Sequence, residues 1–160
     1  MKPRLYLETT IPSYLTARPT RDPLMAGQLL ATKQWWNLRR KDFELFISPI
    51  VTLEAQQGDA DAAQRRRKII ADLPELPVTV EAERLLAAIR TEHLLPPKAT
   101  ADALHISIAV VHRLHFLLTW NCTHINNGEI LPAIEKLCAR LGYKCPVVCT
   151  PLELMGVSET

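Results

Sequence analysis

The feature that most constrains the fold of this chain is the alternation of short strand-like segments with longer helical ones. Four segments have the apolar or alternating pattern of β-strands: residues 4–9, 43–48, 115–119 and 147–149. Helical patterns occupy five other segments: residues 23–40, 60–73, 81–92, 101–113 and 129–141. No hairpin turn such as Asn-Gly connects two of the strand-like segments. The sequence therefore predicts a three-layer α/β/α fold, with helices on both faces of a central parallel sheet.

Two strands in this pattern are followed by an acidic residue, the first directly and the second about six residues later. Glu8 follows the first strand, which is expected to lead into a turn at Pro12 and Ser13. Pro49 suits the first turn of a short helix that contains Glu54. In open parallel sheets, ligands bind beyond the carboxyl ends of the strands, where the order of winding reverses. Both acids are therefore expected near the ligand-binding edge.

The segment 101–113 is expected to be the central helix. Apolar residues cover most of its surface, which predicts burial on more than one side. Thr100 precedes it and is expected to cap its first turn. The proline-flanked residues 78–80 are compatible with one further short strand.

Length and composition favour one folded domain over residues 1–160. Of these 160 residues, 48% are hydrophobic, which is enough for a buried core. The net charge of +2 excludes an acidic tail and a strongly basic nucleic-acid-binding arm. No apolar run reaches the roughly 18 residues of a membrane span, and the first four residues do not resemble a signal peptide. We therefore expect a cytoplasmic protein without a membrane partner.

The four cysteines are interpreted as small buried apolar residues, because none forms a CxxC pair. The alternative is a zinc site that combines Cys122 and His124 with Cys138, Cys145 or Cys149. These spacings match no common zinc finger or ribbon.

Four oxygen-bearing side chains fall at or near element ends that a parallel sheet would bring to one edge: Glu8, Glu54, Asp102 and Asn121. Each has an ordinary interpretation alone, as a surface carboxylate, a helix-dipole partner or a turn residue. Together, carboxylates at one edge repel unless a cation balances them. Oxygen ligands favour Mg²⁺ or Mn²⁺, which can take phosphate oxygens in their remaining positions and activate water. This set predicts phosphodiester hydrolysis.

Three sequence blocks carry a family resemblance: YLETTIPSYL at 6–15, TLEAQQGD at 52–59 and DALHISIAVVHRLHFLLTWNCTHI at 102–125. The chain resembles the PIN-domain ribonuclease family, and within it the VapC-like toxins of type II toxin-antitoxin systems. The resemblance implies a metal-dependent endoribonuclease whose metal-binding and catalytic positions are Glu8, Glu54, Asp102 and Asn121. It also implies a homodimer and a small antitoxin protein as partner.

Two positions depart from the family pattern, which has Asp where this chain has Glu8 and Asn121. Glu8 is longer but can still reach an ion, and the Asn121 carbonyl is a neutral ligand, so a second ion would bind more weakly. The alternative function is a catalytically weakened PIN-fold module that binds RNA or protein. A nucleotide-binding enzyme ranks last, because the turn after the first strand lacks the glycines that admit a pyrophosphate.

Several further residues have candidate supporting roles. Thr9, beside Thr10, is expected to hydrogen-bond the acids, and His105 either contacts a phosphate or is a hydrogen-bonded core residue. Arg18 and Arg21 are the candidate RNA contacts, since their loop begins near Glu8. The basic runs 39–41 and 65–68 could also bind RNA, but such runs are more typical of solvated faces. The Trp-Trp pair at 35–36 is more typical of a core or a dimer interface than of base stacking.

Overall fold

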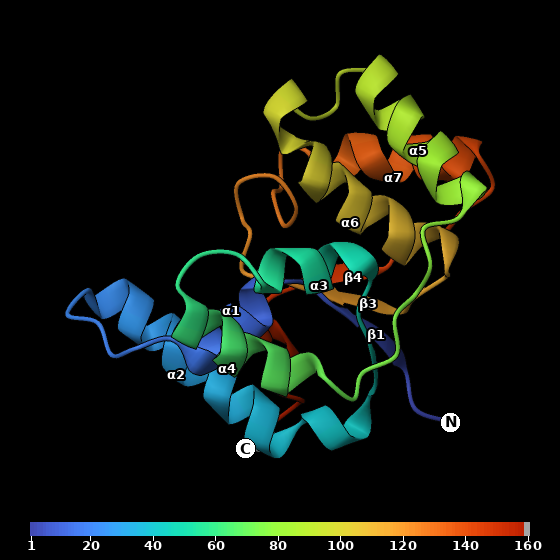
Figure 1. Ribbon diagram of the computed structural model, residues 1–160. Helices are drawn as coiled ribbons and strands as arrows, with labels where there is room; N and C mark the ends of the chain where they lie inside the picture. The colour runs from blue at the N-terminus through green and yellow to red at the C-terminus, as the bar shows by residue number, and fades with distance from the viewer. Residues whose placement is uncertain (159–160) are drawn as a thin grey trace.

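A four-stranded, entirely parallel sheet lies at the centre of the computed structural model, which describes residues 1–158 (Figure 1). The strands are β1 (Arg4–Leu7), β2 (Glu44–Phe46), β3 (Phe116–Leu118) and β4 (Val147–Cys149). They lie in the order β2-β1-β3-β4. The chain winds from β1 to one side and then returns to the other, so the winding reverses between β1 and β3. The predicted parallel α/β fold is confirmed.

Seven α-helices surround this sheet. They are α1 (Thr10–Thr16), α2 (Pro23–Leu38), α3 (Pro49–Ala55), α4 (Ala60–Ile70), α5 (Val80–Thr91), α6 (Thr100–Val111) and α7 (Leu131–Arg140). Short 3₁₀ helices cover Arg40–Asp42, Pro97–Ala99 and Pro151–Leu154. Figure 1 shows α5, α6 and α7 grouped on one side of the sheet and α1, α2 and α4 on the other. Among residues 1–158, no helix combines the length and the apolar character of a membrane span.

The core forms between the sheet and its helices. Leu5, Tyr6 and Leu7 of β1 are completely buried, as expected for a strand covered on both faces. Seven residues of α6 are buried, including His105 and Ser107, which confirms the expected burial of this helix on more than one side. The carboxyl ends of β1 and β3 therefore lie at an edge of the sheet that well-buried elements form.

The expected turn at Pro12 and Ser13 is wrong, because these residues belong to α1. The carbonyl of Glu8 accepts from the backbone N of Ile11 at 3.0 Å, and that of Thr9 accepts from Ser13 at 3.2 Å. Proline is compatible with the first turn of a helix, where the backbone N–H groups have no partner within the helix. The helix therefore begins almost directly at Glu8.

Two further local predictions are also wrong. Thr100 is the first residue of α6 and gives no side-chain cap; its hydroxyl instead donates to the carbonyl of Pro97 at 2.9 Å. Residues 78–80 form no strand, because Thr79 caps α5 by accepting from the backbone N of Ala82 at 3.2 Å. The extended pairing in this region comes earlier, at the bridge between Ile47 and Glu75.

Candidate metal centre

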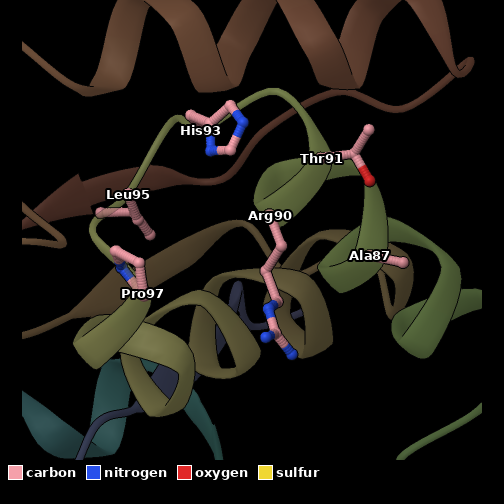
Figure 2. A pocket seen from close by; sticks show the side chains of 6 residues that line it. All are labelled: Ala87, Arg90, Thr91, His93, Leu95 and Pro97. Carbon is pink, nitrogen blue, oxygen red and sulfur yellow. The ribbon is translucent and has the colours of Figure 1, made fainter.

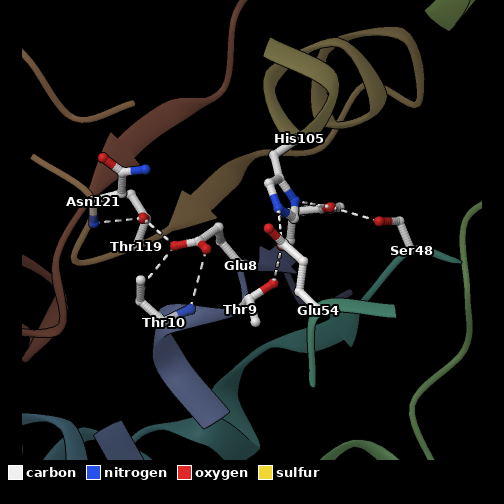
Figure 3. A network of polar contacts seen from close by, with 9 residues as sticks. Glu8, Thr9, Thr10, Ser48, Glu54, His105, Thr119 and Asn121 are labelled. Carbon is white, nitrogen blue, oxygen red and sulfur yellow. Dashed lines mark hydrogen bonds and ion pairs between the residues drawn. The ribbon is translucent and has the colours of Figure 1, made fainter. Parts of the chain in front are cut away.

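Glu8 lies at the point where the winding reverses. Its backbone N donates to the carbonyl of Leu118 at 3.1 Å, which extends the β1–β3 pairing by one step. The side chain is buried and accepts from three groups: the hydroxyls of Thr119 at 2.5 Å and Thr10 at 2.7 Å, and the backbone N of Thr10 at 3.1 Å (Figure 3). A carboxylate this buried requires such donors. The position of Glu8 in the sequence puts the carboxylate at the end of β1, and Thr10 and Thr119 fix its orientation.

Glu54 approaches from α3 on the other side of β1. Its Oε1 accepts from the Thr9 hydroxyl and from Nε2 of His105, both at 2.6 Å (Figure 3). Burial raises the pKa of Glu54, but the hydrogen bonds from His105 and Thr9 and the charge of His105 outweigh it, so the pKa lies below its usual value. Thr9 thus hydrogen-bonds an acid, as predicted. Oε2 of Glu54 has no hydrogen-bond partner within residues 1–158 and remains open to a ligand.

His105 connects Glu54 to a buried hydrogen-bond chain. Its Nδ1 lies 2.7 Å from the hydroxyl of Tyr6, which lies 2.7 Å from the hydroxyl of Ser48. Burial raises the pKa of Tyr6 far above its usual value, so the phenol stays protonated. Both ring nitrogens of His105 therefore have a partner, Nδ1 in Tyr6 and Nε2 in Glu54. His105 is both a satisfied core residue and the group that orients a candidate ligand.

Ligand atoms of Glu8, Glu54 and His105 all lie within 4.8 Å of one another, and no other group of this kind occurs in the part of the chain that the structure describes. Neither glutamate forms an ion pair with a lysine or arginine of that part. Two carboxylates this close repel unless a cation lies between them. Since both nitrogens of His105 are hydrogen-bonded, the available ligands are carboxylate oxygens, which fit Mg²⁺ or Mn²⁺.

The structure places the other two predicted ligands beside this group rather than in it. Asp102, in the first turn of α6, lies 2.9 Å from Nδ1 of His124 through its Oδ2. The amide oxygen of Asn121 accepts from the backbone N of His124 at 3.0 Å, so it stabilises the turn after β3. The metal-binding role of Asp102 and Asn121 stays a prediction.

Sequence reasoning missed three side chains that hold this edge together: Thr119, Tyr6 and His124. Thr119 ends an apolar strand as Glu8 does, and this shared position is the signal that could have identified it. Tyr6 looks like an ordinary strand residue, and only the packing of α6 against β1 brings its hydroxyl to His105. The role of His124 depends on the fold of the loop after β3.

The remaining candidates lie outside the centre. Arg18 and Arg21 are exposed, and Trp35 is completely buried against Phe43, which agrees with a core role. A cavity of about 430 Å³ lies at the end of α5, with Arg90, His93 and Leu95 in its lining (Figure 2). None of its lining residues is acidic, so we do not assign it to the metal centre.

The cysteines form no metal group in residues 1–158. Cys138 and Cys149 are buried, as predicted, whereas Cys145 is half-buried and Cys122 exposed. The alternative zinc site at Cys122 and His124 is therefore not formed.

The buried thiol of Cys149 predicts a loss of stability at alkaline pH. Burial, with a smaller contribution from Glu153, raises the pKa of Cys149 from about 9 to about 12. The unfolded thiol ionises first, so this contribution to the free energy of unfolding is complete below pH 9 and is lost as pH rises toward 12, at roughly 1.4 kcal/mol per unit. Urea unfolding measured from pH 7 to 11 should show that the free energy of unfolding falls less steeply with pH in Cys149→Ala than in the wild type. Equal slopes for the two proteins would contradict this.

Comparison with known proteins shows a likeness in fold to solved structures. No family model and no curated protein matches the sequence. Among solved structures, the fold is similar to a chain in the crystal structure of VapBC2 from Rickettsia felis bound to a DNA fragment from their promoter. The TM-score is 0.53 and the identity 18%, over 91% of this chain and 97% of that chain. A likeness at this identity concerns the fold.

Proposed function

We propose that this protein is a divalent-metal-dependent endoribonuclease that hydrolyses phosphodiester bonds of single-stranded or structured RNA in the cytoplasm. The observation that carries the proposal is the close approach of Glu8 and Glu54 at the reversal point of a parallel sheet, where neither forms an ion pair with a lysine or arginine of residues 1–158. The sequence resemblance to PIN-domain ribonucleases and the fold shared with a VapBC2 chain support it.

Glu8 and Glu54 would hold Mg²⁺ or Mn²⁺, with Asp102 and Asn121 as the further ligands that the resemblance implies. The bound ion supplies an acidified water and neutralises charge on the phosphate. The role of the protein is to fix the carboxylates: the hydroxyls of Thr10 and Thr119 hold Glu8, while Thr9 and His105 hold Glu54. Asp102 is oriented by His124. We include residues 1–160 in one nuclease domain.

A toxin role with a small antitoxin partner and a homodimeric state belongs to the same proposal. It is supported by the resemblance to VapC-like toxins and by exposed apolar residues on α2. These are Leu24, Leu30 and Leu38. Exposed apolar side chains of this size are typical of protein contacts when they gather on one element.

The second candidate function is an RNA- or protein-binding module with weakened catalysis. The specific observation in its favour is that the Asn121 amide and the Asp102 carboxylate already have partners in the loop at His124. An ion would then have two carboxylates rather than four oxygen ligands.

Cleavage of a mixed-sequence single-stranded RNA separates the two functions. We expect the purified protein to cut the RNA in Mg²⁺ or Mn²⁺ and to lose all cutting in EDTA. Binding of RNA without cutting in either metal, by protein shown to be folded by circular dichroism, would instead support the binding module.

A further inference from the structure

A basic cavity of about 380 Å³ lies between the end of α1 and the beginning of α4. These two helices pack together (Figure 1). Three arginines line it: Arg18, which follows α1, and Arg65 and Arg66 of α4. The one acidic residue of its lining is Asp59. Since the whole chain has a net charge of only +2, three guanidinium groups at one cavity are a local concentration of positive charge.

Much of the hydrogen-bonding capacity of these arginines is unused. Arg65 donates through Nε to the carbonyl of Thr16 at 3.3 Å, so its two terminal nitrogens stay available. Arg18 has no hydrogen-bond or ion-pair partner within residues 1–158. Asp59 accepts from the backbone N of Ala62 at 3.0 Å and forms no ion pair with the arginines. With three arginines and one aspartate in its lining, the cavity therefore retains a net positive charge.

The same elements connect this cavity to the candidate metal centre. The helix α1 begins at Thr10, which holds Glu8, and its seven residues span about 10 Å along the axis, so Arg18 lies about that far from Thr10. Arg66 donates through Nε to the carbonyl of Ala55, the residue after Glu54, at 3.0 Å. A distance of about 10 Å corresponds to roughly three steps of a stacked strand at about 3.4 Å each.

We infer that this cavity binds a backbone phosphate of the RNA substrate, a few nucleotides from the bond that is cut. A guanidinium fork donates to two phosphate oxygens at once, which makes arginine the preferred side chain for such a contact. The identity of the ligand as RNA rests on the proposed function. Arg21, the other candidate RNA contact, does not line the cavity.

The test is RNA binding rather than cleavage. Fluorescence anisotropy with a labelled single-stranded RNA in EDTA gives Kd over a series of salt concentrations. Arg18→Gln and Arg65→Gln are each expected to raise Kd about 5- to 10-fold and to lower the slope of log K against log salt by about 0.7. Arg67→Gln is the matched control, because Arg67 is exposed on the same helix and does not line the cavity; its Kd should change less than twofold.

The variants also separate this inference from the nuclease proposal. Arginine-dependent binding without cleavage would support the cavity and contradict the nuclease, whereas cleavage with unchanged Kd in Arg18→Gln and Arg65→Gln would overturn the cavity alone. Arg18→Gln removes no internal contact, so misfolding does not explain its effect. An equal loss in Arg67→Gln, or binding of an acidic peptide in place of RNA, would also overturn the inference.

Discussion

Glu54→Gln is expected to abolish metal-dependent RNA cleavage while leaving the fold unchanged. The substitution keeps the shape of the side chain and its contacts with Thr9 and His105, but it removes one of the two charges that would hold the ion. Cleavage should fall by more than about 100-fold, beyond the roughly 10- to 100-fold effect of residues that only orient a metal ligand. The measurement is the initial rate of RNA cleavage in Mg²⁺ and Mn²⁺.

Glu8→Gln and Asp102→Asn are expected to behave in the same way. The matched control is Glu135→Gln, an exposed acid of α7 outside the centre, which should cleave at the wild-type rate. Full activity of folded Glu54→Gln would refute the centre at Glu8 and Glu54. Full activity of Asp102→Asn alone would limit the ligands to those two glutamates.

His105→Leu is expected to lower both stability and cleavage. The imidazole is completely buried and hydrogen-bonds Tyr6 and Glu54, so leucine of similar size leaves two polar groups without that partner. At roughly 1–3 kcal/mol for each such group, the free energy of unfolding should fall by about 2–6 kcal/mol. Thermal unfolding should show a Tm lower by about 2–4 °C for each kcal/mol in a protein of this size.

Two variants make the His105 prediction specific. Tyr6→Phe removes only the hydroxyl that lies between His105 and Ser48 and keeps the bond from His105 to Glu54, so it should cost less stability and retain more cleavage than His105→Leu. His112→Gln changes a histidine near the end of the same helix that has a single bond, at 2.8 Å, to the carbonyl of Pro77, and it should leave cleavage unchanged. Equal stability of His105→Leu and the wild type would show that the hydrogen-bond chain is dispensable.

The sequence predicts the sheet and the central helix well because both have a strong periodic signal. Strands such as 116–118 are continuous apolar runs between helices, and a parallel sheet is the arrangement that buries them on both faces. The turn expected at Pro12 is wrong because proline fits the first turn of a helix as well as it fits a loop. The strand expected at 78–80 is wrong because β-branched residues also occur at the start of a helix, here one that Thr79 caps.

The candidate site could be predicted only where a residue has an unusual position in the chain. Glu8 and Glu54 stand out because they follow strands, and the structure brings their carboxylates together. Thr119 reaches Glu8 through the register that pairs Leu7 with Leu118, which no local pattern reveals. The hydrogen bonds of Asp102 and Asn121 depend on the loop at His124, and its conformation is likewise a property of the folded chain.

The pairing of Glu8 with Thr119 has a consequence for the protein during its synthesis. The two residues are 111 positions apart, and Thr119, directly after β3, completes the set of donors around Glu8. A nascent chain that has not yet emerged beyond β3 thus has Glu8, Thr10 and Glu54 but lacks Thr119, the second hydroxyl that holds Glu8. On the proposed nuclease function, we expect an unfinished chain on the ribosome to be less active than the complete protein, because its first acid is not yet fully held.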